Sequence, residues 1–443
     1  MIEYEAMSVA LYHWDTLAEA DRKRLLARSG AVIEDLRATV EPIIAAVQTE
    51  GDAALIRLTR EFDGVDISGP GIAVSVEEFD EAEHTLDRAV REALDFAIEN
   101  VRRFHRAQLE TFHRTVEVRR GIVASERSTP IESVGLYVPS GRGSFPSMLY
   151  MLAVPATLAA VPTIVVTTPP RRDGTVDPGV LYAARQCGIT EVRRVGGAQA
   201  IAALAFGTES VPAVRKAIGP GSAYVAAAKR LVADRVDVGL PAGPSESIVL
   251  ADSAADPWRV ALDLMIEAEH GADSAALLVT ESEELATQTA RYIEHLLQDV
   301  PGQRRTFLEE VFTRFGGIVI TPDAATSVAV VNQFAPEHLM IHSADPKALA
   351  SDITEASEIL LGPHTAFSLA NYATGANAIL PTGGWAHTWG PVSVRDFQKT
   401  SSVVEVTAEG YDLMRDHVIA LADYEGFFTH AAALRRRDEE RPF

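Results

Sequence analysis

The sequence predicts an α/β fold with two modules, each built on a parallel β-sheet covered by helices, and with helical segments at both ends of the chain. Two observations carry this prediction. Short apolar strands alternate with alanine-rich helices from about residue 131, and a second alternating segment follows residue 251. Such alternation is typical of parallel sheets, because parallel neighbours are joined by a crossover that is usually a helix.

Residues 15–115 are predicted to be mostly helical, because apolar residues recur there at spacings of three and four. The segment WDTLAEADRKRLLAR begins near Asp15, a residue type that caps helix N-termini. The longest helical stretch ends among arginines, and His105 and His113 are expected there on a solvent-exposed helical face.

The strands of the first alternating segment are predicted from short apolar runs. The candidates are SVGLYVPS, PTIVVTT, EVRRVGG, RKAIGPG and SESIVLAD, and helices such as AIAALAFG and SAYVAAAKRLVAD separate them. The second segment contains the candidates AALLVTE, GGIVITP and HLMIHS. From about residue 391 we expect a helical tail that ends in RRRDEERPF.

These patterns divide the chain into four predicted parts. Residues 1–33 form an N-terminal helical segment. Residues 34–136 and 251–390 together form a first α/β module, which carries the candidate metal-binding and catalytic residues. Residues 137–250 form a second α/β module, and residues 391–443 form the C-terminal tail.

The charge and the cysteine content exclude several classes of function. The 443 residues include 62 acidic and 40 basic side chains, for a formal net charge of −22. A surface this negative repels phosphate backbones and anionic lipids, so neither nucleic acid nor a membrane is expected as a partner. The one cysteine, Cys187, cannot form an internal disulfide and is expected to be a small buried residue, as in a reducing cytosol.

One uncharged run, from Ser144 to Pro170, is long enough to span a membrane. Prolines interrupt it at Pro155, Pro162 and Pro169, and its TIVVTT segment is typical of a buried parallel strand. We therefore expect a buried helix followed by a strand. The acidic N-terminus shows no secretory signal, so the protein is expected to be cytoplasmic.

Three glycine-rich turns follow predicted strands: 141–143 (Gly-Arg-Gly), 196–199 (Gly-Gly-Ala-Gln) and 219–222 (Gly-Pro-Gly-Ser). Such turns let backbone N–H groups approach an anionic cofactor. None of them is the complete dinucleotide-binding fingerprint, so tight turns of purely structural use are an equal alternative.

Two pairs of residues suggest chemistry. Glu267 and His270 are three residues apart, which on a helix places both side chains on one face, as two ligands of a metal or as a solvated ion pair. Glu337 and His338 follow a proline at the entrance to a strand, and two adjacent proton acceptors suit acid–base catalysis near neutral pH. The alternative for this second pair is a surface glutamate beside a partly buried histidine.

Taken together and in order, these stretches resemble the histidinol dehydrogenase family. The matching stretches are VGLYVPSG, VGGAQAIAALAFGTESVP, GPGSAYVAAAKR, LPAGPSE, EAEHGADS, NQFAPEHL, NYATGANAILPT and RDFQKT, followed by the pair Glu425 and His430. The resemblance spans nearly the whole chain, and it implies that the two α/β modules are Rossmann-like.

The resemblance implies a zinc- and NAD-dependent dehydrogenase that oxidises a primary alcohol to a carboxylic acid in two steps through a bound aldehyde. By this resemblance, His338 accepts the hydroxyl proton as hydride leaves for NAD, and Glu337 activates the water that adds to the aldehyde. Tyr137 and Gln199 match NAD contacts of the family, and Ser222 stands where the family has an asparagine in its second NAD-binding turn.

The resemblance also implies a metal site and a homodimer. His270 and His430 match zinc ligands, while Ser245 and Glu425 match contacts to substrate. In the family the C-terminal tail reaches across a two-fold axis, so Glu425 and His430 are expected to complete the active site of the partner subunit.

The sequence departs from the family at the metal. Where the family has a glutamine and an aspartate, this chain has Glu267 and Asn371. The exchange is reciprocal, so one carboxylate and one amide are still present and the total ligand charge is unchanged. We therefore expect that the site still binds a metal.

The substrate positions change more. The family's glutamate and histidine near the substrate are replaced by Phe367 and Ala378, and GGWAHTWG adds Trp385 and Trp389 nearby. Histidinol carries an ammonium and an imidazole, which need polar partners when buried. The sequence thus predicts a less polar, wider pocket and a less polar alcohol than histidinol. The alternatives are a true L-histidinol dehydrogenase of histidine biosynthesis and a catalytically silent NAD-binding homologue.

Overall fold

The computed structural model describes residues 9–28, 36–109, 114–140, 143–437 and 439. The chain divides into two compact units. The first comprises Met1–Gln108 and Ile131–Phe397, and the second comprises Leu109–Pro130 and Gln398–Phe443. Among the described residues, no helix combines the length and apolar content that a membrane span requires.

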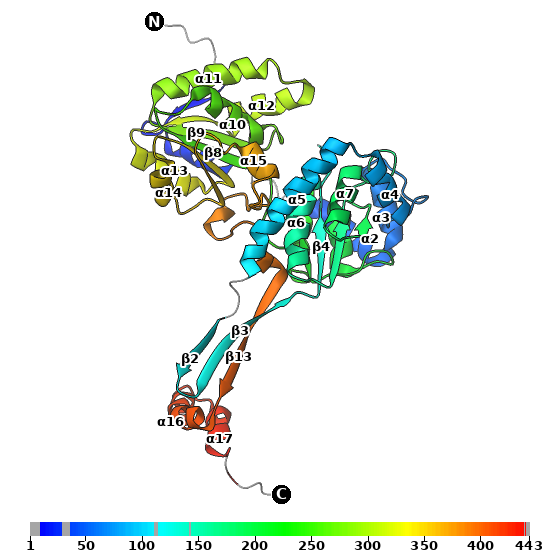
Figure 1. Cartoon of the computed structure of the whole chain (residues 1–443), viewed down its shortest axis with the longest axis vertical. Coiled ribbons are helices and arrows are strands. Elements are labelled where there is room, and N and C mark those ends of the chain that lie inside the picture. Colours follow the sequence, from blue (N-terminus) through cyan, green and yellow to red (C-terminus); the bar gives the residue numbers. More distant parts are fainter. Residues whose placement is uncertain (1–8, 29–35, 110–113, 141–142, 438, 440–443) are drawn as a thin grey trace. The chain divides into compact units, whose positions relative to one another are not determined.

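The first unit contains a six-stranded parallel sheet, with strand order β1-β10-β9-β8-β11-β12 (Figure 1). Its strands are β1 (Leu11–His13), β8 (Glu246–Ala251), β9 (Ala275–Thr280), β10 (Gly317–Ile320), β11 (His338–His342) and β12 (Glu358–Leu361). The segment Leu11–His13 lies in the part of the chain that the sequence predicts to be purely helical. It joins the sheet as an edge strand parallel to β10.

Helices cover both faces of this sheet. They are α1 (Glu19–Ala27), α10 (Pro257–Ala268), α11 (Glu283–Leu297), α12 (Gly302–Arg314), α13 (Ala324–Phe334), α14 (Pro346–Ser351) and α15 (Phe367–Tyr372). Val249 of β8 belongs to the core formed with α10, α11 and α12, whereas the adjacent Ile248 belongs to the core formed with α1 and α13. Both faces are apolar, as expected for a buried parallel sheet.

A second parallel sheet of four strands has the order β6-β5-β4-β7. Its strands are β4 (Ser133–Tyr137), β5 (Thr163–Thr167), β6 (Val192–Arg193) and β7 (Lys216–Ile218). The helices between and after them are α6 (Pro146–Leu158), α7 (Pro178–Gln186), α8 (Gly197–Phe206) and α9 (Ala223–Val232). The uncharged run from Ser144 to Pro170 is thus a buried helix followed by a strand, as predicted.

Four N-terminal helices also belong to the module that is built on this second sheet. They are α2 (Arg37–Glu50), α3 (Asp52–Phe62), α4 (Val76–Thr85) and α5 (Arg88–Leu109). Val40 of α2 and Leu55 of α3 share a core with Ile201 of α8 and Val225 of α9. The sequence assigns residues 34–136 to the other module. The assignment differs because periodicity identifies the apolar face of a helix but not the sheet that covers it.

A second prediction, that His105 at the end of α5 is exposed, is wrong. His105 is fully buried, not solvent-exposed. Its Nδ1 lies 2.8 Å from the carbonyl oxygen of Val101, and the side-chain amide of Asn377 lies 3.2 Å from its Nε2. The neighbouring arginines suggest a solvated face, but residues distant in sequence cover this one. His113 lies outside the described residues.

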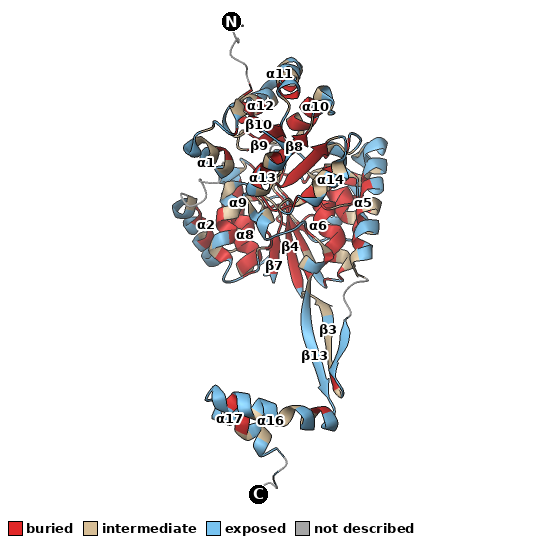
Figure 2. Ribbon diagram, turned by 90° about the vertical axis from the view of Figure 1, so that its left-hand side faces the viewer, coloured by how far each residue is buried: buried red, intermediate tan, exposed pale blue. Residues whose placement is uncertain are grey.

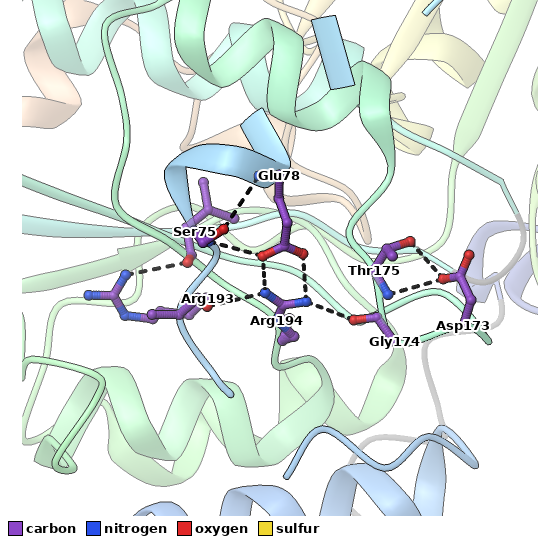
Figure 3. A network of polar contacts seen from close by, with 9 residues as sticks. Ser75, Glu78, Asp173, Gly174, Thr175, Arg193 and Arg194 are labelled. Carbon is purple, nitrogen blue, oxygen red and sulfur yellow. Dashed lines mark hydrogen bonds and ion pairs between the residues drawn. The ribbon is translucent and has the colours of Figure 1, made fainter. Parts of the chain in front are cut away.

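An ion pair between buried Arg194 and half-buried Glu78 joins α4 to the end of β6. Arg194, directly after β6, donates from both terminal nitrogens to the carboxylate of Glu78, at 2.8 and 2.5 Å (Figure 3). The same guanidinium donates to the carbonyl oxygens of Gly174 and Ala73. Glu78 also accepts from the backbone N–H of Ser75, which closes a capping box at the start of α4.

The second unit is a three-stranded antiparallel sheet followed by two helices. The strands are β2 (Thr115–Arg119), β3 (Ile122–Pro130) and β13 (Gln398–Val406), and the helices are α16 (Ala408–Tyr424) and α17 (Phe428–Arg435). Gln398–Val406 lies in the tail predicted to be helical, but all nine residues pair with β3. Most of this unit is exposed, in contrast to the buried strands of the first unit (Figure 2).

Candidate active site

Two adjoining cavities in the first unit collect most of the candidate residues. The smaller has a volume of about 110 Å³, and the larger has a volume of about 1080 Å³. Ser245, His270 and Asn371 line both cavities, so the small one opens into the large one. The small cavity is also lined by Glu267, Glu337, His338 and Ala378.

The cavities lie beside the amino ends of strands of the six-stranded sheet and the carboxyl ends of strands of the four-stranded sheet. Glu337 and His338 stand at the amino end of β11, and Ser245 directly precedes β8. The large cavity is also lined by residues that follow the carboxyl ends of β4 and β7, namely Pro139 and Pro220. The six-stranded sheet thus contributes its amino edge, and the four-stranded sheet its carboxyl edge.

The carboxyl edge of the four-stranded sheet has a switch point between β4 and β7. The chain runs from β4 outward to β5 and β6 and then returns to the other side of β4. Ligands of open parallel sheets bind in the crevice at such a point. Gly219, after β7, has a φ of 133°, and a Cβ there would lie 2.1 Å from the carbonyl oxygen of Tyr137. Only glycine fits this turn.

The predicted cofactor residues surround this switch point. Tyr137 ends β4, and its hydroxyl accepts a 3.2 Å hydrogen bond from the N–H of Gly197. Burial raises the pKa of Tyr137 to about 12, so its hydroxyl stays protonated. Gln199 is buried in α8, and its Oε1 has no hydrogen-bond partner among the described residues.

Ser222 differs in its surroundings from the other two cofactor residues. It occupies the N-cap position of α9 without a side-chain capping bond, is exposed and lines the large cavity. Tyr137 and Gln199 are not among the residues that line either cavity. Gly141 and Arg142 of the first glycine-rich turn lie outside the described residues.

His338 is buried between a carboxylate and an aromatic ring. Its Nδ1 lies 2.7 Å from Oε2 of Glu358, and its Nε2 lies 3.9 Å from Oε1 of Glu337. The ring of Phe367 packs edge-on against the imidazole, with centroids 5.8 Å apart. Burial by itself lowers the pKa of His338, but the charge of Glu267 and the hydrogen bond that the imidazole donates to Glu358 outweigh it and raise the pKa to about 10.

Glu337 is held by the neighbouring strand. Its Oε2 accepts a 2.9 Å hydrogen bond from the backbone N–H of Glu246, the first residue of β8. Burial raises the pKa of Glu337 well above its usual range, because water no longer stabilises the charged form. A carboxyl group in this state can donate a proton as well as accept one near neutral pH.

Arg28 supports the segment that carries the acid–base pair. Its guanidinium donates to the carbonyl oxygens of Phe334 and Ala335, the residues at the end of α13, and stacks 3.9 Å from the centroid of the Phe334 ring. Ala335 adopts a left-handed conformation with a φ of 49°, which turns the chain from the helix towards β11. Arg28 also pairs with Glu246, with Nε 3.1 Å from Oε1.

The candidate metal donors also line the small cavity, and they contact one another. The side-chain amide of Asn371 donates to Oε1 of Glu267 at 2.6 Å, and Nδ1 of His270 lies 3.4 Å from Oε2 of Glu267. Burial raises the pKa of Glu267, but His270, His338 and the bond from Asn371 outweigh it and lower the pKa below its usual value. Glu267 is therefore a buried, ionised carboxylate.

These residues fit a divalent cation. They offer a carboxylate oxygen, an amide oxygen and an imidazole, which are donor types that zinc accepts, although carboxylates and imidazoles are its commoner ligands. Nδ1 of His270 lies 3.2 Å from the carbonyl oxygen of Ile266, as in sites where a backbone carbonyl orients a metal-binding imidazole. Within the described ranges, no three His, Cys, Asp or Glu side chains gather into a metal site, because one donor here is an amide.

Only some of the residues predicted to lie near the substrate line the cavities. Ser245 and Ala378 line the small cavity, as expected of residues close to a substrate. Phe367 is fully buried and is not among the lining residues of either cavity. Trp385 and Trp389 line neither cavity, so they do not add apolar surface to the pocket as the sequence suggests.

Glu425 and His430 belong to the second unit. Glu425 follows the last turn of α16, and His430 lies in α17, where its ring stacks at 5.1 Å from that of Phe427. Both side chains are exposed in the single chain. Their assignment to a metal and substrate site stays a prediction.

Three residues of the site are absent from the sequence-based set: Arg28, Glu246 and Glu358. Glu246 and Glu358 are each the first residue of an apolar strand, in ESIVLA and EILL. A buried glutamate at the start of a parallel strand is unusual, because charged side chains are rarely buried without a partner. That pattern is the one local signal that could indicate them.

Comparisons with known proteins agree on one family. The family model for histidinol dehydrogenase matches residues 26–438. A histidinol dehydrogenase from Synechocystis sp. is 47% identical over 415 residues, which cover 94% of this chain and 96% of the relative. A histidinol dehydrogenase homolog from Cereibacter sphaeroides is 48% identical, with coverage of 95% and 97%.

A solved structure agrees as well. The crystal structure of histidinol dehydrogenase from Elizabethkingia anophelis superimposes with a TM-score of 0.92 at 33% identity, over 97% of this chain and 98% of that one. The fold is thus that of an α/β oxidoreductase. The chain belongs to the histidinol dehydrogenase family, which comprises NAD-dependent oxidoreductases that act on CH–OH groups.

Proposed function

We propose that this protein oxidises a primary alcohol with NAD and zinc, through a bound aldehyde towards the carboxylic acid. The observation that carries the proposal is the small cavity, in which the acid–base pair Glu337 and His338 faces the metal donors Glu267, His270 and Asn371. A proton acceptor beside a metal site is what alcohol oxidation requires.

The two residues of the pair have separate tasks in this proposal. In the first oxidation, which requires the deprotonated imidazole, the O–H proton of the alcohol passes to Nε2 of His338 while the C–H hydride passes to the nicotinamide, and the alcohol carbon becomes an aldehyde. In the second, Glu337 removes a proton from the water that adds to the aldehyde, and the hydrate then loses hydride to a second NAD. The raised pKa of Glu337, which burial causes, makes it a stronger base than an exposed carboxylate.

Glu267, His270 and Asn371 would hold the zinc, together with His430 of the partner subunit. Zinc, when bound, lowers the pKa of an alcohol oxygen and fixes its orientation. Tyr137, Gln199 and Ser222 surround the switch-point crevice, where we place the NAD.

We also propose that the protein works as a homodimer in the cytoplasm. The second unit exposes the apolar side chains of Val403, Val404, Leu421 and Phe428, which supports an interface with another chain. A second copy of the chain is the partner that would use this surface, with Glu425 and His430 completing the site of that copy. The single buried cysteine fits a reducing compartment.

Mixing of inactive variants tests the shared site. His338→Ala and His430→Ala homodimers are each expected to be nearly inactive. If the chains exchange partners, a mixed dimer contains one site with both histidines intact, so activity reappears. Failure to recover activity after confirmed exchange would show that both histidines act within one chain.

The substrate that the names of the relatives favour is L-histidinol. A second candidate is a less polar primary alcohol, because Ala378 lines the cavity where the family has a histidine, and Phe367 replaces a polar residue.

NADH formation by the zinc-loaded protein, with L-histidinol beside a panel of aliphatic and aromatic primary alcohols, separates the two candidates. Fast turnover of L-histidinol supports the first, and turnover of another alcohol alone supports the second. NAD binding without turnover of any alcohol would favour a silent homologue.

A further inference from the structure

Glu358 is a buried carboxylate whose side chain contacts the candidate base. It is the first residue of β12 and pairs in register with His338, the first residue of β11. Because the two residues stand side by side on parallel strands, their side chains leave the sheet on the same face. Oε2 of Glu358 lies 2.7 Å from Nδ1 of His338, and both side chains are buried.

The backbone strengthens this placement. The N–H of Glu358 donates to the carbonyl oxygen of Glu337 at 3.1 Å, and the N–H of Ser357 donates to that of Pro336. The start of β12 is therefore joined to the segment that carries the acid–base pair, by backbone and side chain alike. On its other side the imidazole meets the ring of Phe367, which leaves little freedom to rotate.

The contact with Glu358 decides which nitrogen of His338 carries the proton. A carboxylate accepts hydrogen bonds, so Nδ1 must be the donor and carries the hydrogen. In the neutral imidazole the lone pair is then on Nε2, the nitrogen that faces Glu337. A base in the other tautomer would present an N–H there and could not accept a proton.

The second oxygen of Glu358 indicates that this buried carboxylate does not by itself stabilise the fold. Among the described residues, Oε1 of Glu358 is buried and has no hydrogen-bond partner. An unsatisfied buried carboxylate oxygen costs free energy. His338 is the group in contact that benefits from the charge.

We propose that Glu358 is a positioning residue, which holds His338 in the tautomer that presents the Nε2 lone pair to the alcohol. This inference rests on the proposed alcohol oxidation and adds a residue to it. Glu358 touches neither alcohol nor NAD in this scheme and acts through the imidazole alone.

The test compares Glu358→Gln, His338→Ala and the double variant in steady-state NADH formation. Glu358→Gln is expected to lower kcat about 10- to 100-fold with little change in KM for the alcohol or in NAD binding, because an amide no longer fixes the tautomer. The double variant should be no slower than His338→Ala alone, since a residue that acts only through His338 has nothing left to position. Full multiplication of the two losses would overturn the proposal, as would wild-type kcat in Glu358→Gln.

Glu355→Gln is the matched control. Oε2 of Glu355 lies 2.8 Å from Nδ1 of His387, so it forms the same kind of pair, but neither residue lines a cavity. Its activity should equal that of the wild type. If Glu358→Gln does not fold, Glu358→Asp keeps the carboxylate and is expected to retain an intermediate kcat with the KM unchanged; no activity despite a wild-type melting curve would contradict the proposal.

Nitrogen NMR of histidine-labelled protein separates this inference from the proposed function. The signal absent from His338→Ala belongs to His338 and should report protonated Nδ1 in the wild type but not uniquely in Glu358→Gln. This result can be obtained even if no alcohol is oxidised, in which case the proposed function fails alone. A signal that is identical in the wild type and in Glu358→Gln would refute the positioning role.

Discussion

Two networks of buried charge in the first unit differ in how well their charges are matched. In one, the guanidinium of Arg194 meets the carboxylate of Glu78 and two backbone carbonyls (Figure 3). Burial raises the pKa of Glu78, but the bonds from Arg194 and Ser75 outweigh it and lower the pKa. Both groups therefore stay charged, and the charges cancel.

The network around His338 contains more carboxyl groups than cationic partners. Four carboxyl groups (Glu246, Glu267, Glu337 and Glu358) surround one imidazole and the guanidinium of Arg28. Burial raises the pKa of Glu337 well above its usual range and that of Glu246 to about 7. An ion pair with balanced charge joins two elements of the fold. Carboxyl groups that outnumber their cationic partners can instead exchange protons and attract a cation.

The largest expected effect is on activity in the unmatched network. His338→Ala should lower turnover by roughly 10²–10⁴-fold, the range for loss of a general base. Steady-state NADH formation measures the loss, and a melting curve close to that of the wild type shows that folding is intact. An unchanged turnover would show that His338 takes no part in the reaction. The proposed difference between the two networks would then fail as well.

The next effect is on stability in the matched network. Arg194→Met should lower the free energy of unfolding by about 1–3 kcal/mol, because it leaves the half-buried carboxylate of Glu78 and the carbonyl oxygens of Gly174 and Ala73 without their donor. Chemical denaturation measures this loss. Arg103→Met removes the exposed pair with Glu99 and is the control, with an expected change that is small beside that of Arg194→Met. Equal losses in both variants would mean that burial does not distinguish them.

A smaller effect concerns the choice of substrate. Ala378→His should raise kcat/KM for L-histidinol relative to an aliphatic alcohol by about 10-fold, because it returns a polar partner to the wall of the small cavity. Ala376→His, two residues away and not among the lining residues, should leave the ratio unchanged. If both variants shift the ratio alike, Ala378 does not determine specificity.

The last effect is a gradual change with pH. The folded-state pKa of Glu246 is raised from 4.5 to about 7, mainly by burial and partly offset by Arg28. Since the folded state favours the protonated form, Glu246 makes the free energy of unfolding fall as pH rises from 4.5 to about 7, with no further fall above that range. In the metal-free protein, Glu246→Gln should remove this part of the fall in denaturation experiments. An identical pH profile for both proteins would contradict the assignment.

The sequence predicts the strands of both sheets well because their signal is local. Runs such as TIVVTT and HLMIHS are apolar and rich in strand-forming residues, and they form β5 and β11. The sequence does not predict where α2–α5 pack, because their apolar faces meet helices that are distant in sequence. It also does not predict strand β13, which forms by pairing with the distant strand β3.

The same distinction holds for the site. Glu337 and His338 are adjacent in sequence, and a proline before a strand already marks them. Glu358 becomes a neighbour of His338 only through the order of β11 and β12, and Arg28 reaches the site from α1 at the other end of the chain. The side chain of Phe367 lies in the core instead of the cavity, which its residue type alone does not reveal.

The most direct test of the central claim is the amount of NADH formed per alcohol consumed, by the wild type and by Glu337→Gln, with the alcohol that the zinc-loaded wild type oxidises fastest. The account predicts two NADH per alcohol for the wild type and one for Glu337→Gln, which should stop at the aldehyde because no group activates the water. The same yield at the same rate from both proteins would contradict the role of the buried acid–base pair.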